Sequence, residues 1–314
     1  MSKISIIVPF YNGNQFLPTL LVSLNNSYEQ SARRLQVELI IVLDSMETTI
    51  EQIQTIVNEC ITQAFVVSIF KNKQNMGVDK ARDIGTSYAT GEYITFIDQD
   101  DFVDPLYFSI IENRLQNSNS AVFLLNGKLI NLSNKRYVSI YYFKPNIDLK
   151  RIIYNNPILS PCFWLLKKSL LNEYVCFTLP FTNYKGVDDW YFSIRLFLSY
   201  PQLNIEYIKE RVIYYSIHEN NYSHNLREQI DGAIAVLRSL KNANTMQQKY
   251  IRQRIKTLEF AKLFYLQNKL LSILKHPCIF LLFLYHYMSD KNRMIRFAGR
   301  YIHRVKIKRI VSGN

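Results

Sequence analysis

Several carboxylates follow an apolar run in the segment "YITFIDQDD", residues 93–101. Asp98 and Asp100 are separated by one residue at the expected end of a strand, so both side chains can turn toward one ligand. Carboxylate oxygens suit Mg²⁺ and Mn²⁺, which keep waters and take substrate phosphates as further ligands. In a chain with a formal net charge of +13, this acidic pair predicts a divalent-cation site. The alternative is a solvated acidic turn, in which Asp104 caps a helix that starts at Pro105.

A second acidic pair, Asp188 and Asp189, precedes a helical pattern over 188–199. One carboxylate is expected to cap this helix. The other, beside a bound metal and diphosphate, has the chemistry of a general base toward an acceptor hydroxyl. The alternative is that both are caps. Further on, His218 ends a strand predicted over 204–217, and an imidazole can ligate a metal or bind a phosphate.

A glycine-marked turn leads into a helix in "NMGVDKARDIG", residues 75–85. Gly77 near the helix start lets backbone N–H groups face an anion, and Arg82 can bind a diphosphate with two parallel hydrogen bonds. Alternatively, Arg82 is a surface residue of an amphipathic helix. Both interpretations remain open at this point.

The elements that must position these residues follow an alternating pattern. Continuous apolar, β-branched runs predict strands buried on both faces, and helix-length segments separate them. The strands are expected at 4–10, 37–43, 64–70 and 92–97, and the helices at 15–27, 48–62 and 77–89. Such alternation predicts an α/β fold with a parallel, doubly wound sheet and a ligand site at the carboxyl ends of its strands. Asn12, Asp44, Asn75 and Asp98 should therefore meet on one rim.

The composition predicts a folded protein of a reducing compartment. The 314 residues are 48% hydrophobic, enough for one large domain with an appendage or for two modest domains. The four cysteines show neither disulfide-framework nor zinc-site spacing. The N-terminus lacks a signal-peptide core, and the longest apolar stretch, 277–288, is too short to span a bilayer. We therefore expect a cytoplasmic protein.

The C-terminal part is predicted to be helical and basic. Between Lys275 and Asn314 there are nine Lys or Arg residues against the single Asp290. Within 292–310 the basic residues recur at every fourth position, with an apolar stripe opposite. This pattern predicts that residues 275–310 lie on anionic lipid at the inner face of the cell membrane. Alternatively, the stripe packs on the protein's own catalytic domain or forms a homodimer interface.

In their order and spacing, these segments resemble the family-2 nucleotide-sugar glycosyltransferases of bacterial surface-polysaccharide synthesis. The resemblance covers about residues 3–225. The matching segments are "SIIVPFYNG" (5–13), "ELIIVLD" (38–44), the stretch 75–101, "VDDWYFSIRL" (187–196) and "YYSIHENNYS" (214–223). It implies the GT-A fold, a Rossmann-like, mostly parallel twisted sheet with flanking helices. Residues 1–225 would form the catalytic domain, with a nucleotide-sugar half to about 104 and an acceptor half from 105, and 226–314 a helical, basic region.

The resemblance also implies a role for each candidate residue. Pro9, Tyr11 and Asp44 would line the nucleoside pocket, Arg82 would approach the diphosphate or ribose, and Asp98 would contact the ribose or a metal-bound water. Asp100 would ligate Mn²⁺ or Mg²⁺ with the assistance of His218. Asp189 would be the catalytic base of a single inverting displacement. The donor would be a nucleoside-diphosphate sugar, with UDP as the expected nucleotide, and the acceptor a glycan or a lipid-linked saccharide.

The chain departs from the family pattern at three positions. Ser45 and Met46 follow Asp44 where an Asp-Gly-Ser sequence is usual, Asp83 replaces an asparagine, and Asp188 replaces a glutamate. None of these removes a residue that the mechanism needs. A competing hypothesis is a basic protein that binds nucleic acid or membrane and uses a catalytically inactive scaffold of the same fold. Its nucleic-acid binding would weaken steeply with salt, but no nucleic-acid partner is expected.

Overall fold

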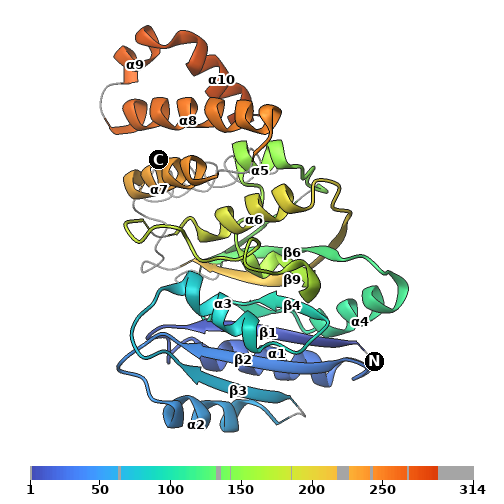
Figure 1. The fold of residues 1–314 in the computed structure, drawn as a ribbon. Coiled ribbons are helices and arrows are strands. Elements are labelled where there is room, and N and C mark those ends of the chain that lie inside the picture. The colour runs from blue at the N-terminus through green and yellow to red at the C-terminus, as the bar shows by residue number, and fades with distance from the viewer. Residues whose placement is uncertain are drawn as a thin grey trace, which may run out of the picture.

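A computed structural model of the chain describes residues 2–62, 65–131, 136–141, 143–184, 186–217, 226–240, 243–266 and 269–288. Figure 1 shows a sheet with flanking helices in the lower part of the molecule and a stack of C-terminal helices above it. The predicted ligand His218 and the predicted amphipathic segment 292–310 lie outside the described residues.

The first half of the sheet is parallel, as the apolar runs predict. Its strands lie in the order β3-β2-β1-β4. They are β1 (Lys3–Phe10), β2 (Gln36–Leu43), β3 (Val66–Lys71) and β4 (Tyr93–Phe96). The connecting helices are α1 (Leu17–Glu29), α2 (Ile50–Cys60) and α3 (Val78–Tyr88). Because all of these neighbouring strands are paired in parallel, all four strands end at the same edge of the sheet.

The second half of the sheet is mixed. The short strand β8 (Trp164–Lys167) lies antiparallel between β4 and β6 (Val122–Asn131), and β9 (Ile205–Ile217) runs parallel to β6. The two-residue β5 (Phe102–Val103) pairs with β9, and β7 (Arg136–Ser139) pairs with β6. The four residues of β8 are flanked by the 3₁₀ turns Pro161–Phe163 and Lys168–Leu170. Periodicity alone cannot distinguish such a short apolar run from part of a buried helix.

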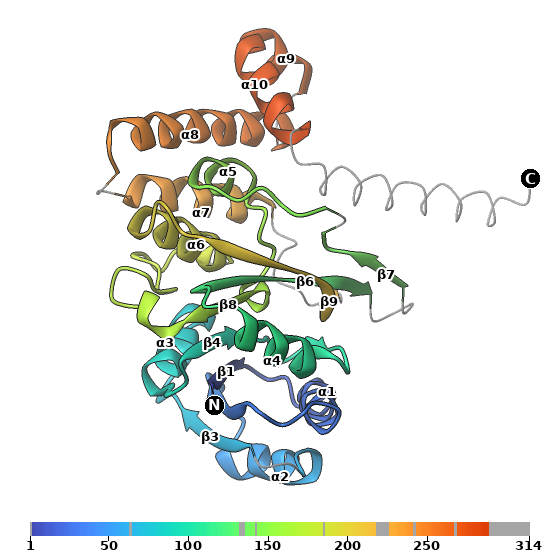
Figure 2. The same ribbon diagram turned by 90° about the vertical axis from the view of Figure 1, so that its right-hand side faces the viewer.

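Helices cover both faces of the sheet. Helices α3 and α6 (Asp188–Ser199) lie on one side, and α1 and α4 (Tyr107–Asn117) on the other (Figure 2).

Two predicted helix caps are wrong. Helix α4 begins at Tyr107 rather than Pro105, and Asp104 accepts a hydrogen bond from the Leu106 N–H instead of capping the helix. The residue that precedes α6 is Val187, and no side chain caps the helix. Both aspartates lie within the first turn, and Asp188 is paired with Arg82.

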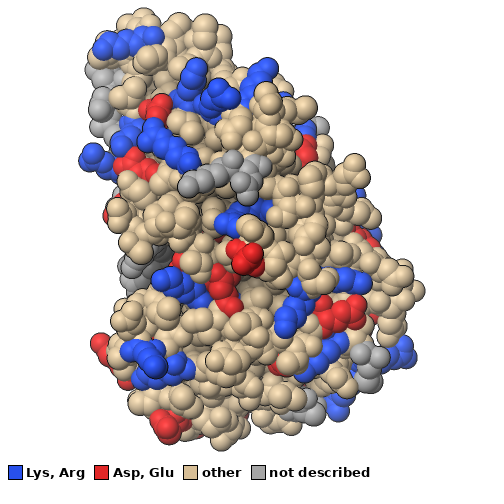
Figure 3. All heavy atoms as spheres, viewed as in Figure 1, with Lys and Arg blue, Asp and Glu red and all other residues tan. Residues whose placement is uncertain are grey.

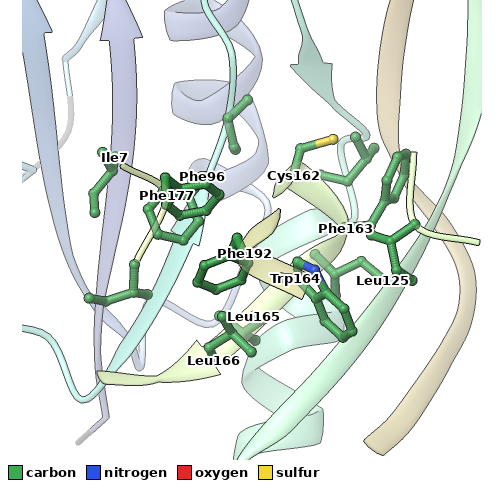
Figure 4. Packing of buried hydrophobic residues seen from close by; sticks show 14 of the residues in the cluster. Ile7, Phe96, Leu125, Cys162, Phe163, Trp164, Leu165, Leu166, Phe177 and Phe192 are labelled. Atoms are coloured by element: carbon green, nitrogen blue, oxygen red, sulfur yellow. The ribbon is translucent and has the colours of Figure 1, made fainter. Parts of the chain in front are cut away.

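An aromatic cluster fixes α6 on the sheet. Phe192 of α6 stacks on Phe177 with ring centroids 4.1 Å apart, and Phe96 of β4 meets Phe177 edge-on at 4.8 Å. Figure 4 shows these rings beside the buried residues of β8. Large buried aromatic side chains contribute most of the packing free energy at such a contact. The start of α6 is thereby held at the carboxyl edge of the sheet.

The C-terminal helices form a layer above α6 and α5 (Leu149–Asn155), as both views show (Figures 1 and 2). They are α7 (Leu226–Ser239), α8 (Thr245–Leu266), α9 (Lys269–Lys275) and α10 (Pro277–Met288). Phe283 of α10 packs against Phe260 and Phe264 of α8, so part of the apolar surface packs on the protein itself. None of the helices in the described ranges is long and apolar enough to cross a membrane.

Candidate active site

A cleft of about 1120 Å³ opens between the carboxyl edge of the sheet and the C-terminal helices. It brings together every predicted site residue that the structure describes, namely Pro9, Tyr11, Asp44, Arg82, Asp98, Asp100 and Asp189. In Figure 3, acidic side chains gather in the middle of the face where the sheet meets the upper layer, and Lys and Arg side chains are frequent over that layer. Segments far apart in the sequence thus share one site.

Arg82 joins the two halves of this cleft. Its guanidinium donates to Asp98 at 2.6 Å, after β4, and to Asp188 at 2.5 Å, at the start of α6. Arg82 is only 4% exposed, so the interpretation of Arg82 as a surface residue is wrong. The guanidinium also lies 5.4 Å from the centre of the Phe177 ring. Planar geometry lets one Arg serve two carboxylates and an aromatic face at once.

Burial and pairing act in opposite directions on these charges. Burial by itself would lower the pKa of Arg82, but Asp98 and Asp188 outweigh it and raise that pKa, so Arg82 stays charged. Burial raises the pKa of Asp188, against the lowering effect of Arg82. A buried charge of this kind is tolerated only when it is paired and hydrogen-bonded. The pairing therefore accounts for three ionisable side chains in the middle of the fold.

Asp189 is the acid of this pair that does not contact Arg82 directly. It lines the cleft at the first turn of α6, where one carboxylate oxygen accepts the Trp190 N–H at 2.6 Å. Burial, and then the negative charge of Asp188, raise the pKa of Asp189 to about 7. A carboxylate with a pKa near neutrality can both lose and accept a proton under physiological conditions.

Asp44 supports the rim of the cleft. It is buried after β2 and accepts hydrogen bonds from the Asn72 side chain and from the N–H groups of Met76 and Gly77, at 2.7–2.8 Å. The Gly77 N–H thus faces an anion, as predicted, but the anion is the protein's own carboxylate. Gly77 itself has a φ of 97°, a conformation that favours glycine. Asp44 still lines the cleft, and its predicted contact with a nucleobase stays a prediction.

The acidic loop after β4 is fixed by its neighbours. The Gln99 amide donates to the Tyr11 carbonyl and accepts from the Tyr11 N–H, both at 2.8 Å. Asp101 is buried and accepts the Ser216 N–H of β9 at 2.8 Å. Sequence reasoning assigned a role to neither Gln99 nor Asp101. These bonds leave Asp100 at the cleft surface between two anchored residues.

The residues present suit a cation that is shared with a substrate. Among the described residues, no three His, Cys, Asp or Glu side chains are grouped closely enough to form a metal site by themselves. Asp98 and Asp100 nevertheless line the same cleft, and Mg²⁺ is commonly held by one or two carboxylates together with waters and substrate phosphates. The arrangement therefore fits a metal–diphosphate complex rather than a metal bound by protein alone.

Other parts of the site were missed by sequence reasoning. Asp83 accepts the N–H groups of Phe177 and Thr178 at 2.9 and 2.7 Å, and thereby ties α3 to the segment that leads into α6. Helices α5, α7, α8 and α10 also contribute to the cleft, including Tyr154, Ile230 and Leu258. The only sequence signal for Asp83 was its departure from the family's asparagine. The helices gave no signal, because their contribution depends on how the layers stack.

Comparison with known proteins agrees with this architecture. The chain superimposes on the crystal structure of Staphylococcus aureus TarS residues 1–349 with a TM-score of 0.60 at 20% identity, over 91% of this chain and 80% of that one. A structure of the same protein in complex with UDP-GlcNAc gives a TM-score of 0.60 at 21% identity, over 84% and 73%. The GT-A fold with a helical C-terminal region is therefore confirmed.

The family follows from the sequence comparison. Residues 5–175, more than half of the chain, match the model of glycosyl transferase family 2, and the chain belongs to that family. An uncharacterized glycosyltransferase of Haemophilus influenzae is 40% identical over 105 residues, 33% of this chain and 38% of that protein. The poly(ribitol-phosphate) beta-N-acetylglucosaminyltransferase TarS is 26% identical over 232 residues, 69% of this chain and 36% of TarS. The chain thus spans little more than a third of the length of these two relatives.

Removing the Arg82 charge should destabilise the fold strongly. We expect Arg82→Gln to lower the free energy of unfolding by about 3–5 kcal/mol, because two carboxylates are left without their partner. Urea denaturation followed by circular dichroism at pH 7.5 measures this. The matched control is Arg151→Gln, which breaks the exposed pair with Asp148 and should cost less than about 1 kcal/mol. Equal losses for the two variants would contradict the central role of Arg82.

Proposed function

We propose that this protein is an inverting, metal-dependent glycosyltransferase that moves a sugar from a nucleoside-diphosphate donor, with UDP as the expected nucleotide, to a saccharide acceptor in surface-polysaccharide synthesis. The observation that carries the proposal is the common cleft. Asp98 and Asp100 follow β4, Asp189 begins α6, and all three line one cavity. Family membership supports sugar transfer in general. The chain's relatives include enzymes named for polymer acceptors and for lipid acceptors, such as TarS and a cholesterol galactosyltransferase of Borreliella burgdorferi.

The donor is expected to bind at the sheet end of the cleft. Tyr11, half exposed just after β1, would offer its ring to the nucleobase. Pro9 and Asp44, which line the same cleft, would complete the nucleoside pocket. Arg82 holds Asp98 in place, so its effect on the diphosphate or ribose passes through that carboxylate. A divalent cation held by Asp100 and His218 together with the donor phosphates would neutralise charge on the departing nucleoside diphosphate.

Asp189 would take the proton of the acceptor hydroxyl as that oxygen attacks the anomeric carbon. Its raised pKa suits the task, because a base with a pKa near the working pH is both deprotonated and basic enough to accept a proton. Asp188 would contribute by position and charge, since its own carboxylate is held by Arg82.

A donor screen tests the activity. We expect release of UDP from UDP-GlcNAc or a related UDP-sugar in the presence of Mn²⁺ or Mg²⁺, and its loss when a chelator is added. Asp189→Asn should reduce turnover by about 10²–10⁴-fold, the usual contribution of a general base, while donor binding measured by calorimetry is kept. Glu59→Gln, on the remote helix α2, is the control and should keep full activity. A near-normal rate for Asp189→Asn would refute the assignment of the base.

The pH dependence tests the same residue independently. Asp189 must be deprotonated to act, and its pKa is raised to about 7. We therefore expect kcat/KM to be constant above pH 8 and to fall about tenfold for each pH unit below 7. Asp188→Asn removes a neighbouring negative charge, so the pKa of Asp189 should fall and the acid limb should move to lower pH. A limb that stays in place or moves upward would contradict this electrostatic account.

Peripheral contact with anionic membrane is a further part of the proposal. Leu270 and Leu274 of α9 are largely exposed, and Lys269 and Lys275 stand at the two ends of that helix. Exposed leucines beside lysines are the composition of an interfacial helix. This surface lies at the top of the molecule in Figure 1, beyond the cleft.

Vesicle co-sedimentation tests the membrane contact. With vesicles of equal parts phosphatidylcholine and phosphatidylglycerol, the double variant Leu270→Asp/Leu274→Asp should bind at least roughly tenfold more weakly, because it loses apolar area and gains negative charge. Val22→Asp, at a similarly apolar position of α1, is the control. Equal sedimentation of all three proteins would exclude this surface as the contact. A molar mass that rises with protein concentration, measured by light scattering without vesicles, would instead indicate a homodimer.

A further inference from the structure

One side chain of the acidic loop after β4 is bonded to the segment that follows β1. Gln99 lies between Asp98 and Asp100. Its amide nitrogen donates to the Tyr11 carbonyl and its amide oxygen accepts the Tyr11 N–H, both at 2.8 Å. Two opposed hydrogen bonds to one residue fix both the position and the orientation of that residue's backbone. Gln99 and Tyr11 both line the cleft.

The chain beside Tyr11 leaves room for this carboxamide. Gly13 is buried, and a Cβ atom at Gly13 would overlap with the amide carbon, nitrogen and oxygen of Gln99. The φ angle of Gly13 lies outside the left-handed region, so the backbone conformation does not require glycine there. The close approach of the Gln99 carboxamide therefore accounts for the glycine.

The residue between these two is held in an uncommon conformation. Asn12 has a φ of 48°, in the left-handed region that asparagine tolerates better than most residues. Its side-chain carbonyl accepts a hydrogen bond from the Ser45 hydroxyl, after β2. Residues 11–13 are thus held from two sides, by Gln99 after β4 and by Ser45 after β2. Such a conformation persists because its surroundings fix it.

The side chain that these contacts orient is the Tyr11 ring. It is 53% exposed, so packing constrains it only in part, and its direction depends on the backbone that carries it. An aromatic ring can stack on any nucleobase, because every base has a π-face. Binding by a ring that is already in place costs less conformational entropy than binding by a mobile one.

We propose that Gln99 is a positioning residue for nucleoside recognition, which holds residues 11–13 so that the Tyr11 ring lies where the nucleobase binds. This proposal deepens the proposed function and rests on it, because the nucleoside pocket is assigned there. Gln99 directly precedes Asp100, the proposed cation ligand. The loop that would hold the cation therefore also shapes the pocket for the base.

Binding of UDP and of pyrophosphate to the whole chain tests this role. In calorimetry with Mg²⁺ present, UDP reports on base and diphosphate together, and pyrophosphate on the diphosphate alone. We expect Gln99→Ala to weaken UDP binding roughly fivefold to a hundredfold, the effect of losing two hydrogen bonds of ordinary strength, and to change pyrophosphate binding less than about twofold. Gln54→Ala, which removes a carboxamide bonded to Asn58 on α2, is the control and should keep both affinities.

Gly13→Ala tests the same contact from its other side. The added methyl group takes the space of the Gln99 carboxamide, so this variant should weaken UDP binding by a factor similar to that of Gln99→Ala. In the double variant the methyl group meets no carboxamide, and UDP should bind as it does to Gln99→Ala, within about twofold. Circular dichroism confirms that each variant is folded.

The outcomes separate this proposal from the proposed function. Equal UDP binding by the unaltered protein and by Gln99→Ala would overturn the positioning role. A parallel loss of UDP and pyrophosphate binding would also overturn it, because Gln99 would then serve the cation loop alone. Effects of Gly13→Ala and Gln99→Ala that multiply in the double variant would show that they act through separate contacts, and would overturn it as well.

Two further results concern the enzyme. An unaltered protein that binds UDP in the expected way but transfers sugar from no donor would overturn the enzymatic function and retain the role of Gln99. An unaltered protein that binds no UDP would overturn both.

Discussion

The ion pairs of Arg82 with Asp98 and Asp188 are the interaction on which the site depends. They join the end of β4 to the start of α6 through one buried guanidinium. Removing Arg82 leaves both carboxylates without a counter-charge, and because Asp188 is buried, this costs far more than an exposed pair contributes. The spacing between the proposed metal-binding loop and the proposed base is therefore set by the length of one side chain of α3.

The same helix also fixes the segment before α6. Asp83, next to Arg82, holds the N–H groups of Phe177 and Thr178, and the Phe177 ring stacks on Phe192 of α6. Ionic, hydrogen-bonding and aromatic contacts thus converge on the first turn of α6. These contacts set the position of Asp189, and burial beside Asp188 raises its pKa. Its proposed chemistry is a consequence of packing as much as of residue type.

The carboxylates in and beside the cleft divide into two kinds. Asp44 and Asp101 accept backbone N–H groups and hold loops in place, and Asp188 is bound by Arg82. The proposed chemistry is assigned to the other two acids, with Asp100 as a metal ligand and Asp189 as the base. The family model ends at residue 175, before α6 and the C-terminal helices. The proposed base Asp189 therefore lies outside the matched residues, and its place in the cleft follows from this chain's own contacts.

The sequence by itself determined the parallel half of the sheet and the rim residues. Continuous β-branched runs form strands buried on both faces, and residues just after such runs meet at one edge, which is why Asp44, Asp98 and Asp100 could be predicted to lie together. These signals are local, because they depend on periodicity within a few residues. The tertiary structure decided the rest. Four features depend on contacts between residues far apart in the chain: the two partners of Arg82, the antiparallel insertion of β8, the uncapped start of α6, and the faces of α7 and α8 that line the cleft. No local pattern encodes which distant charge or surface a side chain will meet.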